Sequence, residues 1–422
     1  MRISTLQAFN NGVAGLQRNY ANATRTQEQI STGNRILTPA DDPVASVRLL
    51  QLEQQQNVLG QYNANLTAAK NSLTQEEVTL NSVNTVLQRV RELAVQAGNG
   101  GLSAEDRKSI AAELTEREDE LLSLMNTRNA RGEYLFSGFQ GKTQPFVRDG
   151  DGSYSYQGDE GQRKLQIASS LNIAISDNGK SIFENVTNAG RYAITLDATA
   201  QPGSTLSVSA PLVQDEVAVS GNPPFPAAGV GVRFTSNTEY VVYDLASPPD
   251  FTNPPIDPNL VLASGSVDQE AKTTEKLVFR GVAIQFDGIP VGGEAVEVQL
   301  DPSAQKQGIL GTISSLRMAL EDPSSSNAQV RDSVAVALTN LDHGMISVDA
   351  ARGNIGARLN VIETTQTDNE DVTLVNKSVQ AELRELDYAE ALSRLSFQTV
   401  ILEAAQQSYV KISGLNLFNA MR

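Results

Sequence analysis

Leucine recurs every seven residues over a long stretch near the start of the chain. The series runs Leu52, Leu59, Leu66, Leu73, Leu80 and Leu87, and no proline occurs between residues 44 and 97. A seven-residue apolar repeat of this length is typical of a helix that packs against other helices along one stripe. The pattern therefore predicts one helix over 44–97, with these leucines in the core of a helical rod.

The C-terminal part of the chain has a matching stripe. Apolar residues three or four positions apart run from Val334 to Ile362, and they include Leu341, Ile355 and Leu359. The simplest interpretation of both stripes is that the helices at 44–137 and 304–375 pack against each other as an intramolecular bundle. We therefore expect Leu341, Ile355 and Leu359 to belong to the rod core as well.

Two shorter helices are expected beside the long ones. Ser103 followed by Asp106 resembles a capping box, although Glu or Gln is the usual residue at the second position of that motif. A separate apolar stripe runs over 309–320 and stops before Pro323. Because proline breaks helices, the pattern predicts a short amphipathic helix that ends there.

The two ends of the chain carry weaker stripes than the rod. Asn10 and Gln17 are among the polar residues that dilute the N-terminal stripe, so it buries too little apolar area to order alone. Two amphipathic ends of one chain can pair, and we expect both ends to be mobile in the monomer and helical in an assembly. The predicted seam of this terminal coiled coil comprises Leu6, Val13, Tyr20, Tyr388, Leu392, Leu395, Leu402 and Tyr409.

Proline separates the middle of the chain from both flanks. Twelve of the 16 prolines lie between residues 145 and 300, where they prevent long helices. Short β-rich runs occur there at 240–243, 277–279 and 295–300, and Gly and Pro clusters separate them. This alternation is typical of short strands joined by loops. The middle segment is therefore predicted to be an inserted all-β domain.

The fold class that follows is mainly α, a coiled-coil and helical-bundle rod built from both chain ends, with an inserted all-β outer domain. We place the boundaries where proline content and periodicity change. The terminal coiled-coil domain comprises 1–42 and 380–422, the rod 43–146 and 303–379, and the outer domain 147–302.

Charge and composition exclude several classes of function. The 49 acidic residues outnumber the 33 basic ones, for a net charge of −16, which disfavours binding to nucleic acid or to an anionic membrane. The chain has no cysteine and one histidine, so thiol catalysis and multi-histidine metal sites are absent. It has no apolar run of membrane-spanning length, and its start has no apolar segment of the kind found in signal peptides. We predict no enzyme, no catalytic residue, no metal and no cofactor.

Three local patterns have a candidate chemical interpretation, and for each we prefer a structural one. The spacing from Asp149 to Glu160 imitates a calcium loop, but Tyr154 stands where that loop needs glycine, so we predict a turn between two strands. Asp41 and Asp42 are more simply explained if one of them caps a helix that begins near Pro43. His343, within a helical stripe, is expected to be hydrogen-bonded or solvated.

Both flanks resemble bacterial flagellin and its relatives. The run Ser31-Thr-Gly-Asn-Arg-Ile36 and the following Thr38-Pro-Ala-Asp-Asp-Pro-Val44 are similar to a motif of that family. The second run resembles the form found in hook-associated protein 3, a branch of the family, and the C-terminal stretch 387–418 resembles the shared flagellin-type ending. The matching motif residues are Gly33, Arg35, Asp41, Asp42 and Pro43. The resemblance covers about 1–146 and 304–422.

This resemblance implies a structural adaptor with no catalysis. Members of that branch form a ring at the junction between the hook and the filament. The expected partners are hook-associated protein 1, flagellin, further copies of the chain and a flagellar export chaperone. The resemblance also implies export through the flagellar type III apparatus, without a cleavable signal peptide, to the extracellular flagellum.

Two other functions remain open from the sequence. The chain could be a filament subunit, in which case the purified protein would polymerise into long filaments. In a different class, the outer domain could be a module that binds a surface glycan or a host surface, with the rod as its stalk. Binding to a glycan array by residues 148–300 alone would favour that second possibility.

Overall fold

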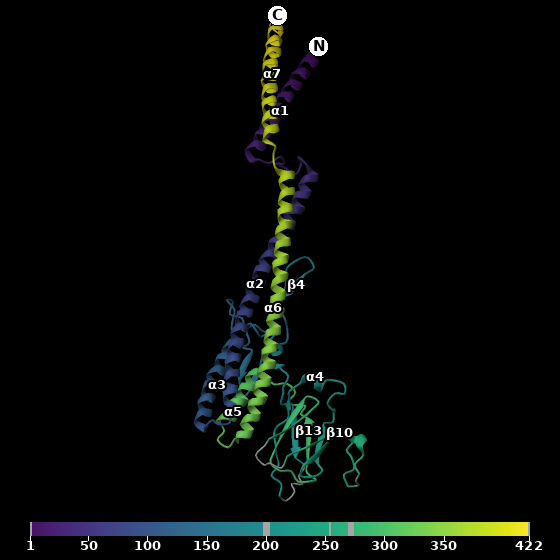
Figure 1. Cartoon of the computed structure of the whole chain (residues 1–422). Helices are drawn as coiled ribbons and strands as arrows, with labels where there is room; N and C mark the ends of the chain where they lie inside the picture. The colour runs from purple at the N-terminus through teal and green to yellow at the C-terminus, as the bar shows by residue number, and fades with distance from the viewer. Residues whose placement is uncertain (1, 197–202, 253–254, 269–273, 421–422) are drawn as a thin grey trace. The chain divides into compact units, whose positions relative to one another are not determined.

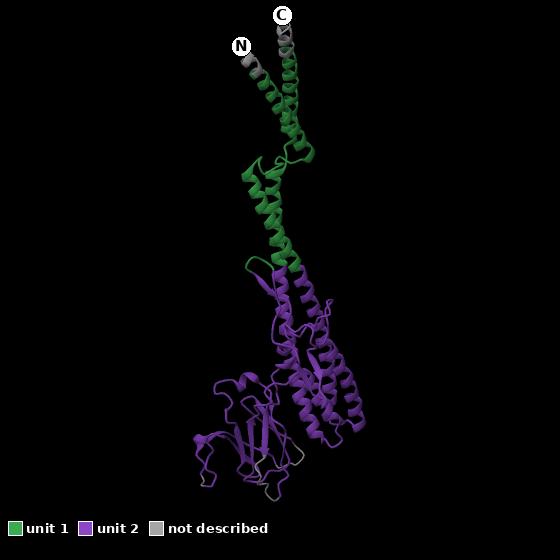
Figure 2. Ribbon diagram, turned by 180° about the vertical axis from the view of Figure 1, so that it is seen from behind, with its two compact units in different colours: residues 1–66, 167–170, 363–422 green, residues 67–166, 171–362 purple. Residues whose placement is uncertain are grey.

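The computed structural model describes residues 2–196, 203–252, 255–268 and 274–420. The chain divides into two compact units (Figure 2). The first unit comprises residues 1–66, 167–170 and 363–422, and the second comprises residues 67–166 and 171–362. Two long helices, α2 (Pro43–Ala97) and α6 (Asn327–Arg384), contribute residues to both units (Figure 1).

The first unit contains both ends of the chain. Helix α1 (Arg2–Thr32) packs against helix α7 (Tyr388–Ala420) (Figure 1), and the expected mobility of both ends in the monomer stays a prediction. The first half of α2 lies beside the last part of α6, where Asn369 Nδ2 donates a hydrogen bond of 3.3 Å to Asn63 Oδ1. This unit is therefore built from segments that are far apart in the sequence.

The predicted helices of the rod are present in the second unit. Helix α3 (Ala104–Met125) packs against α5 (Ile309–Glu321). Ser103 caps α3, because its Oγ accepts from the Asp106 backbone N–H while the Asp106 carboxylate accepts from that of Ser103. Aspartate thus completes a capping box in place of the usual glutamate. Helix α5 ends one residue before Asp322-Pro323, as the sequence indicated.

The leucine stripe of α2 is mostly buried. Leu66, Leu73, Leu80 and Leu87 are fully buried, and Leu59 is nearly so. On α6, Leu341 and Ile355 are buried, whereas Leu52 of α2 and Leu359 of α6 are half-buried. Each fully buried leucine contributes about 1.5–3 kcal/mol relative to an exposed one, so the stripe is a principal source of rod stability.

The inserted domain is all-β, as predicted, and its main sheet has five antiparallel strands. Their order is β10 (Val261–Ser266), β9 (Glu239–Asp244), β8 (Val230–Phe234), β13 (Ala295–Leu300) and β5 (Tyr192–Leu196). A second sheet contains β11 (Glu275–Phe279), β12 (Val282–Asp287), β6 (Ser207–Val208) and β7 (Leu212–Val213). The rings of Phe234 and Phe286 join the two sheets, 5.4 Å apart and nearly perpendicular.

Shorter elements lie between the rod and these two sheets and in the loops of the sheets. Two hairpins pair β1 (Phe146–Arg148) with β2 (Tyr154–Tyr156) and β3 (Lys164–Gln166) with β4 (Asn172–Ala174). Single turns follow as η1 (Lys180–Glu184), α4 (Glu216–Val219) and η2 (Pro258–Leu260). Of the helices in the described part of the chain, none has the length and apolar character to cross a membrane.

Candidate functional site

The residues of the 31–44 motif form the connection between α1 and α2. Gly33 ends α1 with a φ of +71°, in the left-handed region that glycine adopts without strain. A Cβ at this position would come within 2.9 Å of the Tyr388 hydroxyl oxygen, at the start of α7. Glycine is therefore needed here for two reasons, the backbone turn and the close approach of α7.

Backbone hydrogen bonds join this connection to the one between α6 and α7. The Arg35 N–H donates to the Arg384 carbonyl oxygen at 2.8 Å, and the Leu386 N–H donates to that of Gly33 at 3.0 Å. The Arg384 side chain donates in return to Asn34 Oδ1 at 3.0 Å. We call residues 33–35 and 383–386 the clasp. The clasp joins the C-terminal end of α1 to the N-terminal end of α7.

The two aspartates of the motif have different tasks. Asp41 accepts hydrogen bonds from the backbone of Leu37 and Thr38 and from the Thr38 hydroxyl, and it forms an ion pair with Arg25. The bonds from Thr38 lower the pKa of Asp41 to about 2, so its carboxylate is ionised at any physiological pH. Asp42 Oδ1 accepts from the Ala45 N–H at 2.9 Å. It caps α2, whose first residue is Pro43, as we predicted for one of the pair.

A third aspartate, which the sequence analysis did not single out, caps α7. Asp387 Oδ1 accepts from the backbone N–H groups of Ala389 at 2.9 Å and Glu390 at 3.1 Å. Its position directly before the helical run 388–420 is the usual one for a helix N-cap and was a signal that could have identified it. The start of α7 is therefore fixed twice, by this cap and by the clasp.

Small and polar residues fill the contact between α1 and α7 near the clasp. Ala23 and Ala391 are buried there, together with Thr26 and Gln29. Gln29 Nε2 donates to the Arg35 carbonyl oxygen at 2.6 Å. Farther along, the rings of Phe9 and Tyr409 lie 5.3 Å apart. The pair is thus closely packed at its base and has an aromatic contact toward its ends.

The predicted seam residues divide into two sets. Val13, Leu395, Leu402 and Tyr409 are half-buried, while Tyr20, Tyr388 and Leu392 are exposed. The side chain of Leu6 lies outside the described residues. Helix α7 exposes further apolar residues to solvent, which are Phe397, Val400, Ile401 and Val410. An exposed apolar surface of this extent is typical of a protein interface, and the role of the seam in assembly stays a prediction.

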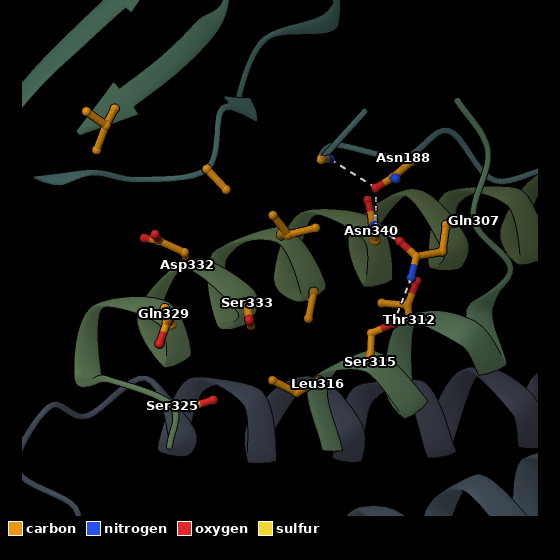
Figure 3. Close-up of a pocket in the computed structure, with 15 residues that line it drawn as sticks. Asn188, Gln307, Thr312, Ser315, Leu316, Ser325, Gln329, Asp332, Ser333 and Asn340 are labelled. Atoms are coloured by element: carbon orange, nitrogen blue, oxygen red, sulfur yellow. Dashed lines mark hydrogen bonds between the residues drawn. The ribbon is translucent and has the colours of Figure 1, made fainter. Parts of the chain in front are cut away.

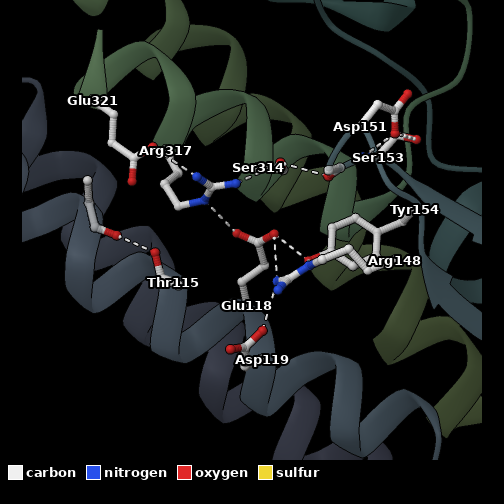
Figure 4. A network of polar contacts seen from close by, with 12 residues as sticks. Thr115, Glu118, Asp119, Arg148, Asp151, Ser153, Tyr154, Ser314, Arg317 and Glu321 are labelled. Carbon is white, nitrogen blue, oxygen red and sulfur yellow. Dashed lines mark hydrogen bonds and ion pairs between the residues drawn. The ribbon is translucent and has the colours of Figure 1, made fainter. Parts of the chain in front are cut away.

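In the second unit, a buried carboxylate joins three segments of the rod (Figure 4). Glu118 of α3 is fully buried and accepts from Arg317 Nε of α5 at 2.9 Å and from Arg148 Nη2 of β1 at 3.2 Å. The hydroxyl of Tyr154 on β2 donates to the same carboxylate. Burial raises the pKa of the Tyr154 hydroxyl, which therefore remains a donor. Because both carboxylate oxygens are satisfied, the network is structural rather than catalytic.

The calcium-like sequence forms the turn that we predicted, between β1 and β2. The Asp149 N–H donates to the Ser153 carbonyl oxygen at 2.8 Å, and Asp151 Oδ1 accepts from the Ser153 backbone and hydroxyl. In the described residues no group of three or more His, Cys, Asp or Glu side chains is arranged to hold a metal ion. His343 is hydrogen-bonded, because its Nδ1 lies 2.9 Å from the Thr187 carbonyl oxygen.

A polar cavity of about 530 Å³ lies between α5, α6, the 187–190 loop before β5 and the 208–210 segment between β6 and β7 (Figure 3). Asn340 Nδ2 donates to Asn188 Oδ1 at 2.9 Å and to Gln307 Oε1 at 3.2 Å, so these amides satisfy one another. Asp332 is the charged residue among those that line the cavity, and burial raises the pKa of its carboxyl group. These contacts hold α5, α6 and the 187–190 loop together, and we assign no ligand to the cavity.

Known proteins are similar to this chain in sequence. Residues 3–141 match the family described as the bacterial flagellin N-terminal helical region. Flagellar hook-associated protein 3 of Escherichia coli K12 is 33% identical over 207 residues, which are 49% of this chain and 62% of the relative. The chain thus spans less than two thirds of that relative's length. A flagellin of Clostridium tyrobutyricum is 23% identical over 405 residues, or 94% of this chain and 95% of the relative.

Solved structures share the fold. A crystal structure of flagellar hook-associated protein 3 from Legionella pneumophila matches with a TM-score of 0.63 and 27% identity, covering 79% of this chain and 98% of that one. A crystal structure of the flagellar junction protein FlgL from the same organism gives 0.61 and 28%, covering 80% and 100%. The resemblance inferred from the 31–44 motif is confirmed. The chain is similar, in sequence and in fold, to flagellar hook-associated protein 3.

Proposed function

We propose that this chain is a structural subunit of the bacterial flagellum that joins the hook to the flagellin filament. The observation that carries the proposal is the pair of terminal helices, α1 and α7, which are tied at their base by the clasp and present apolar side chains to solvent. The names of the relative in Escherichia coli and of the junction protein in Legionella pneumophila support it. The function requires no catalysis.

The exposed apolar residues of α7 indicate how this subunit would associate with its neighbours. Leu392, Phe397 and Val410 are more than half exposed on α7. Full burial of such a side chain contributes about 1.5–3 kcal/mol, so covering several of them is enough to drive stable association. We infer that residues 1–42 and 380–422 form the assembly domain. In this proposal 43–146 and 303–379 form the rod, and 147–302 form the outer domain.

The partners follow from the place of a junction subunit. It contacts hook-associated protein 1 on the hook side, flagellin on the filament side and further copies of itself in a ring. We also propose an export chaperone as a transient partner, because the apolar face of α7 has to be shielded before assembly. We propose the flagellar type III apparatus as the route of export.

Imaging of labelled flagella tests this proposal directly. Flagella from a strain carrying an epitope in an exposed loop of the outer domain are decorated with gold-labelled antibody and examined by electron microscopy. We expect one band of label at the hook–filament boundary. Label along the whole filament would overturn the proposal in favour of a filament subunit, and flagella without label would overturn a flagellar role.

The filament-subunit alternative deserves its own measurement because the Clostridium flagellin aligns over nearly its whole length. Purified chain is concentrated and seeded with short filament fragments, and its polymerisation is followed by light scattering. A junction subunit adds a limited number of copies and then stops. Continued growth into long filaments would identify the chain as a flagellin.

A further inference from the structure

The contact between α2 and α6 in the first unit contains buried amides among its apolar residues. We call residues 43–66 of α2 and 363–384 of α6 the neck. Asn369 and Asn376 are buried in its seam, next to Leu59 and Leu66. Asn376 Nδ2 has no hydrogen-bond partner among the described residues. Amides in a two-helix seam fix register at a cost in stability, so the neck gains less from its own packing than the rod does.

The outside of the same pair carries several exposed apolar residues. Val44, Val47 and Leu50 of α2 are 80%, 56% and 64% exposed, and on α6 Leu374 and Val375 are 68% and 61% exposed. A two-helix pair that is complete by itself has its apolar residues in the seam and its amides at the surface. The neck departs from this pattern, because two asparagines are buried in its seam and several valines and leucines are exposed, which indicates that part of its outer surface is covered in the functional state.

The charges on the two helices indicate what covers it. One face of α2 carries Val44, Val47, Arg48 and Val58, because the last three lie three, four and fourteen residues after Val44. Asp368, Asp371, Val372 and Val375 share one face of α6 by the same rule. In the described part of the chain no ion pair involves Arg48, Asp368 or Asp371. One face is apolar with a cation, and the other is apolar with two anions.

We propose that these two faces of the neck bind each other between neighbouring copies of the chain. The inference rests on the self-association in the proposed function and names the surfaces that carry it. Because the two surfaces differ, the contact is heterologous, and repeating it builds a ring or a helical array rather than a closed dimer. Arg48 of one copy meets Asp368 and Asp371 of the next, while the valines pack around them.

The same contact is impossible within one chain. The helices are antiparallel and Asn63 lies opposite Asn369, so Arg48 lies at the level of the end of α6. At 1.5 Å per residue, Arg48 and Asp371 of one chain are about 20 Å apart along the helix axis. The contact therefore requires a neighbour that is shifted along the axis by about 20 Å.

Cysteine cross-linking tests the geometry, since the chain has no cysteine of its own. A tagged Arg48→Cys chain and an untagged Asp371→Cys chain are expressed together, and isolated flagella are oxidised. The matched control pairs Glu53→Cys with Glu370→Cys, which are exposed on the opposite sides of the same helices. We expect a disulfide-linked heterodimer from the first pair, at about ten times the yield of the control. Equal yields, or no heterodimer although both chains are at the junction, would overturn the inference.

Charge reversal tests the energetics. Arg48→Asp places like charges in the contact and should reduce incorporation into flagella about tenfold, while Arg48→Asp combined with Asp371→Arg should restore most of it. Both residues are exposed, so the melting temperature of the monomer should not change. A double variant as defective as the single one would overturn the pairing. Failure of the proposed function has a different signature, because the parent chain would then be absent from the junction.

Discussion

Arg358 of α6 donates two hydrogen bonds to the carboxylate of Asp177, from Nη2 to Oδ1 at 2.8 Å and from Nη1 to Oδ2 at 3.1 Å. The Asp177 backbone N–H donates to Glu76 Oε1 of α2 at 3.1 Å. Glu76 is almost completely buried, and Asp177 adds a second negative charge beside it. Arg358 forms its ion pair with Asp177, and among the described residues no ion pair involves Glu76.

This arrangement predicts an unusual pH dependence of the rod. Burial, and then repulsion from the Asp177 carboxylate, raise the pKa of Glu76 well above its usual value, against weaker opposing effects of the Asp177 backbone N–H, Arg358 and Arg163. With a folded-state pKa above the unfolded one, the contribution of Glu76 to stability is fully present below the unfolded pKa and is lost as pH rises through the folded pKa. Glu76→Gln should therefore stabilise the rod at neutral pH and flatten this loss, measured by urea unfolding from pH 5 to 8.

Glu77→Gln is the matched control for this experiment. Glu77 is the next residue of α2 and accepts from Arg352 at 3.2 Å in a partly exposed ion pair, which is worth at most about 1 kcal/mol. Its removal should not stabilise the rod or alter the slope above pH 5. A parent protein whose stability rises toward pH 8, with no change in Glu76→Gln, would contradict the prediction.

The leucine stripe predicts a second outcome. Leu73→Asp places an unpaired carboxylate at a fully buried position of α2 and should cost several kcal/mol. The rod should melt at a lower temperature in circular dichroism, while the inserted domain, which has its own core, keeps its transition. Thr74→Asp is the control, since the neighbouring side chain is exposed. Equal melting curves for the two variants would show that the stripe does not support the rod.

The terminal pair predicts that assembly and folding can be separated. Leu395→Ala with Leu402→Ala removes two half-buried side chains from α7. Because they are already half-buried, completing their burial in the assembly is worth about 1.5–3 kcal/mol per subunit. The monomer should keep its melting temperature, yet docking to the hook should fail, leaving hooks without filaments and shed flagellin in the medium.

Ser396→Ala with Glu403→Ala, at exposed positions one residue farther along α7, is the control and should leave motility normal. The melting curve and the motility of each variant are measured side by side. A destabilised monomer would show that these leucines already stabilise the free chain. Normal motility of the double leucine variant would show that the seam does not carry the junction.

The clasp predicts a local effect of a single methyl group. Gly33→Ala forces an alanine into the left-handed region, at a cost of about 1–2 kcal/mol, and sets its Cβ against the Tyr388 hydroxyl. Proteolysis should become faster in the connections next to the clasp and stay unchanged in the rod. Adding Tyr388→Phe removes the close contact but not the backbone strain, so it should restore part of the resistance. Cleavage at the parental rate in Gly33→Ala would contradict this account.

Local signals in the sequence predicted the elements well. The strand at 295–300 and the end of α5 before Asp322-Pro323 appear where the patterns placed them, because proline and alternation act over a few residues. The aspartate cap of α2 and the capping box of α3 were equally local. Each of these depends on neighbours that can be read directly from the chain.

The parts that were missed depend on residues far apart in the sequence. No local pattern shows that Arg35 bonds to the backbone near Arg384, or that Glu118 of α3 meets Arg317 of α5. The heptad also continued through Leu52 into the neck, where the structure buries asparagines and exposes valines. Periodicity identifies a stripe, but which residues face a partner is decided by the neighbouring helix.

The clasp also determines the order in which the molecule can be completed. Residues 33–35 meet their partners only when residues 383–386 are present, so a chain that is still emerging has no closed terminal unit. The inserted domain, whose strands all come from residues 192–300, can form long before that point. A chain that is still being synthesised or exported therefore completes the pair of α1 and α7 last. A copy that lacks residues 383–386 cannot form the clasp.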